Sequence, residues 1–264
     1  MKIIDIHAHV FPDAIAQKAT ESVSSFYKLI RFPDRPGTVN ELLRTQNEAG
    51  ISTTCIHSVA VTPHTVQSIN RFIAASVRMY PERLCGFAAI HPDVQDIPRL
   101  VEEVQAAGLK GFKIHPDMQQ FALDDPRTMD MFSAIEGKLP VIIHTGDKRF
   151  EFSRPWQMKK VLEAFPKLVC ICAHLGGWSE WEEASKTLSA YENAYVDTSS
   201  SLYSLKKEEA RKIIRRYSRD RVIFGTDFPM WSPSEELERF ISLGLTEDEQ
   251  EKILRKNAEG LLSL

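Results

Sequence analysis

The sequence lacks the features that would point to a membrane, a nucleic acid or the secretory pathway. No run approaches the ~18 consecutive apolar residues of a membrane-spanning helix. The opening residues 1–14 are interrupted by aspartate and histidine, so they do not form the apolar centre of a signal peptide. Thirty-three basic residues face 36 acidic ones, a net charge of −3 over 264 residues, which is not the basic excess of a nucleic-acid-binding protein. We therefore expect a cytoplasmic protein that acts on a small molecule.

Cysteine is also scarce. The four cysteines are Cys55, Cys85, Cys170 and Cys172. They form no CxxC pair, and each lies within an apolar, strand-like run. This pattern is typical of reduced core residues in a cytosolic protein, so we expect all four to be reduced. An alternative is that Cys170 and Cys172 bind a metal.

Short apolar runs alternate with amphipathic segments along the whole chain. Runs rich in Val, Ile, Phe and Cys predict strands over 2–7, 52–58, 84–90, 111–115, 141–144, 168–174, 194–197 and 222–227. Helical spacing and capping residues predict helices over 38–49, 66–78, 96–107, 126–135, 155–164, 179–190, 205–217, 233–243 and 247–262.

Strand followed by helix, eight times, predicts parallel strands joined by right-handed crossovers. Eight such units in 264 residues fit a closed (β/α)₈ TIM barrel, with residues 1–264 as a single domain. The alternative is an open doubly wound sheet. That fold usually has a glycine-rich phosphate-binding turn after its first strand, and the HAHVFP of this sequence is not one.

Polar residues stand at the ends of these predicted strands. They are His7, His9, Lys113, His115, His144, His174, Asp197 and Asp227. The carboxyl ends of barrel strands converge on one mouth, and residues two apart on a strand share a face, so His7 and His9 can reach one cation together. Neutral imidazole and carboxylate are ligands of Zn²⁺ and related ions. The pattern predicts one divalent metal ion, Zn²⁺, with Mn²⁺ as the alternative.

Each of these residues also has a structural explanation. A histidine at a strand end is more often a hydrogen-bonded structural residue than a ligand, and Asp227 could cap a helix or form a turn. Asp5 could either orient a ligand imidazole or serve as a buried structural carboxylate. For His57 we favour structure or pocket lining. The combination at matching strand ends favours a metal site, because buried strands otherwise prefer Val, Ile and Leu.

Five motifs carry a resemblance to a known family. DIHAHVFP, GFKIHP, VIIHTG, AHLGG and VIFGTDFP, spread over residues 5–229, resemble the amidohydrolase superfamily. The likeness is to its amidohydrolase-related branch, which includes aminocarboxymuconate semialdehyde decarboxylase and the resorcylate decarboxylases. This resemblance implies a distorted (β/α)₈ barrel with one divalent ion. The ligands of the branch correspond to His7, His9, His144 and Asp227, and its catalytic acid/base corresponds to His174.

The resemblance also bears on Lys113. In binuclear relatives a lysine at the end of strand 4 is carbamylated and bridges two metals, whereas in this branch the residue at that place lines the pocket. Lys113 and the neighbouring His115 are therefore expected to bind substrate. Arg154, or Arg149 in the same loop, could pair with a substrate carboxylate, and Trp178 could form a wall of the pocket.

These residues favour a metal-dependent hydrolase of a small carboxylate, lactone, amide or ester. The ion would activate water, and His174 or Asp227 would transfer the proton. One alternative is a non-oxidative decarboxylase of an aromatic or unsaturated carboxylic acid. A second is a catalytically inactive metal-binding scaffold, which the presence of His174 argues against. The sequence leaves room for a homodimer.

Overall fold

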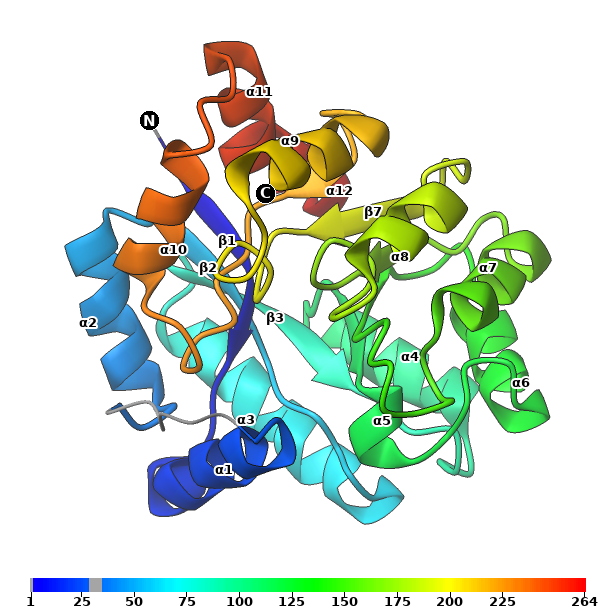
Figure 1. Cartoon of the computed structure of the whole chain (residues 1–264). Helices are drawn as coiled ribbons and strands as arrows, with labels where there is room; N and C mark the ends of the chain where they lie inside the picture. The colour runs from blue at the N-terminus through cyan, green and yellow to red at the C-terminus, as the bar shows by residue number, and fades with distance from the viewer. Residues whose placement is uncertain (1, 29–34) are drawn as a thin grey trace.

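The computed structural model describes residues 2–28 and 35–264. Eight parallel strands form one sheet in which each strand pairs with the next in sequence (Figure 1). They are β1 (Ile4–His9), β2 (Thr53–His57), β3 (Leu84–Ala89), β4 (Gly111–Ile114), β5 (Val141–Ile143), β6 (Cys170–Cys172), β7 (Ala194–Asp197) and β8 (Val222–Ile223). Beside β8, the Ile6 amide of β1 donates to the Phe224 carbonyl over 2.9 Å. The sheet therefore closes into the predicted TIM barrel.

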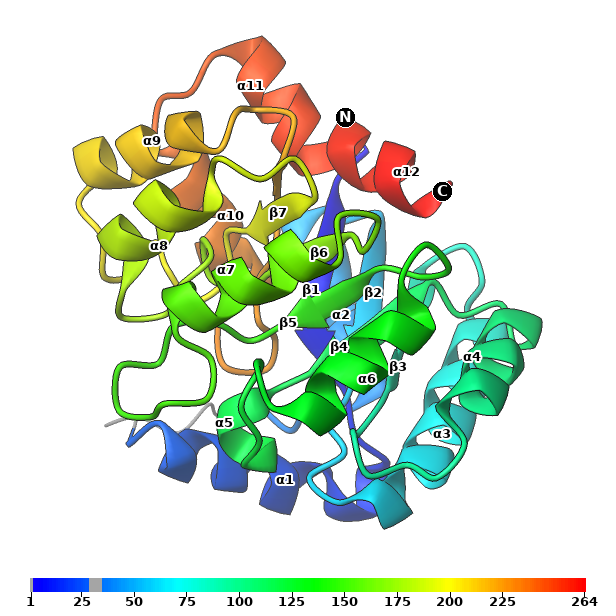
Figure 2. The ribbon, with the colours of Figure 1, turned by 90° about the vertical axis from the view of Figure 1, so that its right-hand side faces the viewer.

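Helices surround the strands (Figure 2). They are α2 (Val39–Ala49), α3 (Val66–Met79), α4 (Ile97–Ala106), α6 (Pro126–Ile135), α7 (Pro155–Ala164), α8 (Trp181–Leu188), α9 (Lys207–Arg216), α10 (Pro233–Ile241), α11 (Glu247–Glu251) and α12 (Asn257–Leu262). A π-helical turn (Lys252–Lys256) separates the last two, which were expected as one helix. Within the described ranges, no helix is long and apolar enough to cross a membrane.

Helix α1 (Asp13–Phe26) was not expected from the sequence. Its buried side chains include Thr20 and Ser24, which are small and polar and so do not give the apolar stripe of a core-facing helix. In Figure 2, α1 lies at one end of the barrel and α12 at the opposite end. Two other short elements were also not expected, η1 (Pro63–Thr65) and α5 (Pro116–Gln119).

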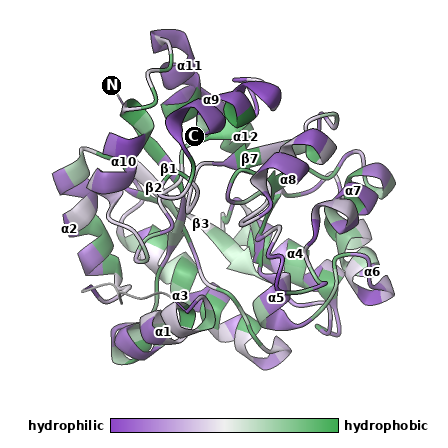
Figure 3. Ribbon diagram, in the orientation of Figure 1, coloured by the Kyte–Doolittle hydropathy of each residue, from purple (hydrophilic) through white to green (hydrophobic). Residues whose placement is uncertain are grey.

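The apolar residues form two clusters. The larger one fills the space between strands and helices, and the smaller one lies within the barrel. Ile6, Phe87, Ile142 and Ile171, from different strands, are fully buried in the inner cluster, and Leu262 of α12 packs with them. Burying such a side chain contributes about 1.5–3 kcal/mol. Figure 3 shows the apolar β3 among helices that carry both polar and apolar faces. The barrel interior is therefore a packed core below the polar strand ends.

Strand β1 pairs irregularly with β2 near its polar residues, and Asp5 ties this part of the strand to the loop after β8. Its pairing register with β2 shifts between Asp5 and Ala8. The Asp5 carboxylate accepts hydrogen bonds from the amides of His7 and Thr226, each over 3.0 Å, and from the Thr226 hydroxyl over 2.6 Å. Asp5 therefore joins β1 to the loop after β8. Of the two roles expected for this residue, the contacts fit the structural carboxylate.

Replacing Asp5 by alanine is expected to lower the free energy of unfolding by about 3 kcal/mol, because three buried donors would lose a carboxylate acceptor. Urea unfolding followed by circular dichroism measures this change. Asp5→Asn keeps one acceptor oxygen and should recover part of the loss. An alanine variant as stable as the wild type would contradict this role.

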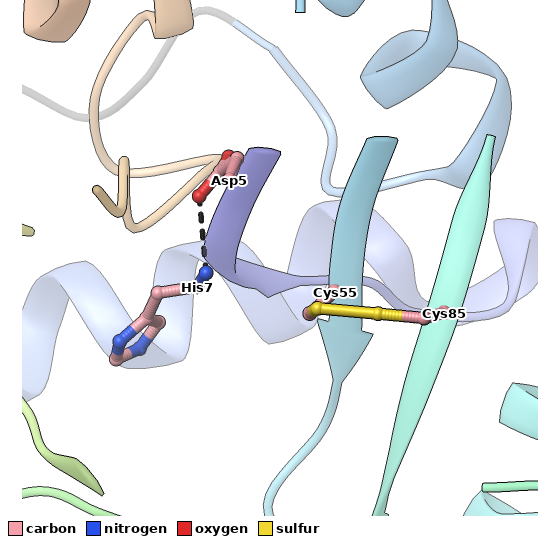
Figure 4. The surroundings of a disulfide bond; sticks show 4 residues. All are labelled: Asp5, His7, Cys55 and Cys85. Carbon is pink, nitrogen blue, oxygen red and sulfur yellow. Dashed lines mark hydrogen bonds between the residues drawn. A yellow bond between two sulfur atoms is a disulfide. The ribbon is translucent and has the colours of Figure 1, made fainter. Parts of the chain in front are cut away.

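One expectation about the cysteines was wrong. Cys55 of β2 and Cys85 of β3 are register partners on adjacent parallel strands, and a disulfide joins them (Figure 4). Thirty residues separate the two in sequence, and the sequence alone does not reveal the register that places them opposite each other. Cys170 and Cys172 are free and buried, as expected.

Candidate metal centre and substrate cavity

Three predicted residues converge where the two ends of the sheet meet. The Nε2 atoms of His7 and His9 lie 3.3 Å apart. Oδ1 of Asp227 lies 3.5 Å from His7 Nε2 and 3.4 Å from His9 Nε2. A tetrahedral shell with bonds of about 2.1 Å places neighbouring donor atoms about 3.4 Å apart. The trio of His7, His9 and Asp227 therefore has both the chemistry and the spacing to hold a divalent ion.

Hydrogen bonds fix the orientation of the His7 ring. Its Nδ1 lies 2.8 Å from Oδ2 of Asp197, which ends β7. An Nδ1–H that donates to this carboxylate leaves the lone pair of Nε2 directed at the trio. Oδ1 of Asp197 accepts from the amides of His174 and Ser199, each over 3.0 Å. Asp197 is thus the buried carboxylate that orients the His7 imidazole.

Backbone conformation positions Asp227. Its φ is +60°, a conformation that aspartate adopts more readily than most residues other than glycine, and its amide donates to the His7 carbonyl over 2.8 Å. Because Ser200 donates to Oδ2, Oδ1 is left to face the two imidazoles. The backbone conformation and the Ser200 contact thus aim the Asp227 carboxylate at His7 and His9.

Burial sets the charge of the trio. It lowers the pKa values of His7 and His9 well below the usual range, and the nearby Lys113 ammonium lowers them further. Both rings are therefore neutral at pH 7, which is the form that binds metals. Burial raises the pKa of Asp227 to about 6, against the Ser200 hydrogen bond. It lowers the pKa of Lys113 to about 8, and Lys113 Nζ lies 3.3 Å from His7 Nε2.

His144 and His174 form a second pair beside the trio. Nδ1 of His144 lies 2.9 Å from Nε2 of His174. The His144 ring stacks on His115 with centroids 3.9 Å apart, and the Tyr27 hydroxyl lies 3.3 Å from its Nδ1. Burial lowers the pKa of His174 to about 4. His174 lies between His144 and His7, with ring centroids 4.7 Å and 5.2 Å away, respectively. The role of His144 as a metal ligand therefore stays a prediction.

A cavity of about 400 Å³ opens above these residues. Its polar floor consists of His9, Lys113, His115, His144, His174 and Asp227. Its walls are mostly apolar and include Phe11, Ile15, Val23, Val61, Ile69 and Phe72. Helix α1 supplies part of the wall, so a helix absent from the sequence expectations lines the cavity.

Of the four residues expected to bind substrate, two line the main cavity, one lines a smaller cavity beside it, and one lines neither. Lys113 and His115 line the cavity. Trp178 packs on Tyr27, with ring centroids 5.0 Å apart, and lines a smaller adjoining cavity. Arg154 contacts the carboxylates of Glu151 and Glu180 over 2.7 Å each. Among the described residues, those that line the main cavity include no arginine.

Some residues of the site gave little signal in the sequence. Tyr27 follows α1, so nothing in the strand pattern places it beside His144. His57 was expected only as a structural or pocket-lining residue; it ends β2, and its ring lies 4.7 Å from that of His7 and 4.5 Å from that of His9. Asp117 lies in the buried turn after β4, where Ser153 donates to its Oδ2 over 2.6 Å.

A closed barrel with a histidine- and aspartate-rich cluster at its mouth is the architecture of metal-dependent barrel enzymes. Residues 4–264 match the amidohydrolase family, and the chain belongs to this family of enzymes. This agrees with the resemblance carried by the five sequence motifs.

Solved structures share the fold over the full length. An uncharacterised TIM-barrel protein from Bordetella bronchiseptica aligns with a TM-score of 0.80 at 22% identity, covering 100% of this chain and 99% of that one. 5-Carboxyvanillate decarboxylase from Sphingomonas paucimobilis aligns with a TM-score of 0.77 at 16% identity, with coverage of 100% and 99%. A dihydroxybenzoic acid decarboxylase from Polaromonas sp. JS666, solved with manganese and 2-nitroresorcinol, gives 0.74 at 18% identity, with coverage of 100% and 97%.

Proposed function

We propose that this protein is a metal-dependent decarboxylase that releases carbon dioxide from a hydroxylated aromatic carboxylate. The observation that carries the proposal is the trio of His7, His9 and Asp227 at the floor of a cavity with mostly apolar walls. A small aromatic acid presents oxygen atoms at one end for a metal and a flat apolar ring for such walls. Decarboxylases of carboxyvanillate and dihydroxybenzoic acid among the structural neighbours support this over hydrolysis.

We propose that His7, His9 and Asp227 hold one divalent ion, with His144 as the fourth protein ligand that the family resemblance implies. When bound, the ion would neutralise the charge on the substrate oxygens and fix the substrate's orientation. Manganese in the Polaromonas structure makes Mn²⁺ the first ion to test, ahead of Zn²⁺. We further propose that residues 1–264 act as one catalytic domain.

The residues on the cavity floor can supply the proton that this reaction needs. A proton adds to the ring carbon that bears the carboxylate, the bond between the two carbons breaks, its electron pair restores the aromatic ring, and carbon dioxide leaves. Asp227 and His174 are titratable groups at the cavity and can carry that proton. Lys113, also on the floor, can pair with an anionic oxygen of the substrate while it is protonated.

The proposal is tested by incubating the Mn²⁺-loaded protein with 2,4- and 2,6-dihydroxybenzoate and 5-carboxyvanillate, and in parallel with aryl esters and lactones. We expect one carbon dioxide released for each decarboxylated phenol formed. Hydrolysis is the competing function, because the same trio could activate water. Acid release from an ester or lactone, with no carbon dioxide from any aromatic acid, would overturn the proposal.

A further inference from the structure

His57 is a buried polar residue whose hydrogen bonds are unaccounted for. It is the last residue of β2 and is 0% exposed. Within the described ranges, neither Nδ1 nor Nε2 of its ring has a hydrogen-bond partner. Leaving a buried polar group unpaired costs about 1–3 kcal/mol, so a native structure normally supplies a partner.

The ring lies where a metal could be that partner. It meets the rings of His7 and His9 edge-on, at interplanar angles of 70° and 90°. One nitrogen from each of His7, His9 and His57 can be chosen so that all three lie within 4.8 Å of one another. His7 and His9 also face Asp227, so the two histidines that His57 approaches are the ones that carry the proposed site.

His144 differs from His57 in this respect. Its Nδ1 lies 2.9 Å from His174, and its Nε2 lies 3.4 Å from the Tyr27 hydroxyl and 3.8 Å from Asp117. Both of its nitrogens thus have polar protein groups within reach, whereas neither nitrogen of His57 has a hydrogen-bond partner among the described residues. The contacts favour His57 as a donor to the ion.

We propose that His57 is a further ligand of the divalent ion, together with His7, His9 and Asp227. This inference rests on the proposed metal-dependent function and adds a ligand from β2 to the set that the family resemblance implies. It assigns β2 a role in metal binding. A water molecule bonded to the ring is the competing explanation, and the variants below distinguish the two.

The test compares Mn²⁺ binding to chelator-treated wild type, His57→Phe, His144→Phe and His91→Phe by isothermal titration. His91 is a matched control, because it is a buried histidine that follows the next strand, β3, but its Nδ1 already accepts from the Asp93 amide over 3.2 Å. We expect His57→Phe to weaken Mn²⁺ binding by at least about tenfold and His91→Phe to change it by less than about twofold. Binding by His57→Phe equal to the wild type would overturn the inference.

Two further measurements distinguish metal ligation by His57 from a loss of Mn²⁺ binding that is caused only by altered packing. His57→Ala should regain Mn²⁺ binding when free imidazole is added, because the imidazole can enter the vacated space. The visible spectrum of the Co²⁺-loaded protein should change in His57→Gln, a milder replacement. No rescue by imidazole, together with an unchanged Co²⁺ spectrum, would contradict ligation by His57.

Carbon dioxide release separates this inference from the proposed function. If metal binding depends on His57 but no aromatic acid is decarboxylated, the ligand assignment stands and the proposed function fails. If the wild type decarboxylates and His57→Phe binds Mn²⁺ normally, the function stands and the ligand assignment fails.

Discussion

Replacing Asp227 by asparagine is expected to reduce decarboxylase activity by at least about 10³-fold while the barrel stays folded. The change removes a negative charge that faces His7 and His9, and it removes a carboxyl group that can carry a proton. Proton transfer by a positioned side chain contributes about 10²–10⁴-fold, and loss of metal affinity adds to this. Asparagine has nearly the same shape and tolerates the positive φ of this residue, so folding should be preserved.

The measurement is kcat/KM from carbon dioxide release, with Mn²⁺ affinity and the circular dichroism spectrum taken on the same samples. Asp220→Asn is the matched control, because Asp220 precedes the same strand, β8, and its side chain is 56% exposed at the other end of the barrel. Its activity should match that of the wild type. An Asp227→Asn variant within tenfold of the wild type would show that this carboxylate neither holds the ion nor moves the proton.

Replacing His174 by asparagine is expected to lower kcat by about 10²–10⁴-fold while one Mn²⁺ stays bound per chain. His174 lies on the cavity floor, where its Nε2 lies 2.9 Å from His144 Nδ1 and its Nδ1 lies 3.1 Å from the Ser199 carbonyl, so both of its nitrogens already have partners. Its φ is +61°, so asparagine again suits the backbone. The variant therefore separates proton transfer from metal binding.

Metal content and kcat are measured together for this variant. A parallel loss of metal would make His174 a ligand and would contradict its assignment as a proton carrier. An unchanged kcat would leave Asp227 as the proton carrier at the cavity. Because a metal-binding scaffold without catalysis has no need of this histidine, a large fall in kcat also argues against that alternative.

The barrel could be predicted from the sequence because its strands are short apolar runs at regular intervals. The strand ends were less predictable. The run 222–227 was expected as a strand, but β8 pairs with β7 only over Val222–Ile223. Beyond it, the chain leaves β7 but stays beside β1, where the Asp227 amide donates to the His7 carbonyl and Asp227 adopts a positive φ. A hydrophobic pattern reports burial, and it does not show that these residues pair irregularly with β1 after the regular pairing with β7 has ended.

The trio could be proposed from the sequence because His7, His9 and Asp227 stand at strand ends that must converge in a barrel. Other parts of the site depend on packing that no local pattern records. Helix α1 buries Thr20 and Ser24 instead of large apolar residues, so its place over the cavity was not evident. The missing partners of His57 are visible only once its neighbours in space are known.

The expectation that all four cysteines are reduced was wrong for the same reason, because local patterns do not record packing between strands. Cys55 and Cys85 each lie in an apolar run, which is the setting of a reduced core thiol. Their disulfide depends on the register between β2 and β3, which pairs these two residues directly. Register is set by the whole barrel and not by either run alone.

The central claim is that His7, His9 and Asp227 hold one divalent ion. Titration of the chelator-treated protein with Mn²⁺, followed by elemental analysis after desalting, tests it most directly. We predict one ion per chain for the wild type and a loss of stoichiometric binding in His9→Ala and Asp227→Ala. Wild-type protein that retains no ion, or variants that bind it as tightly as the wild type, would contradict the claim.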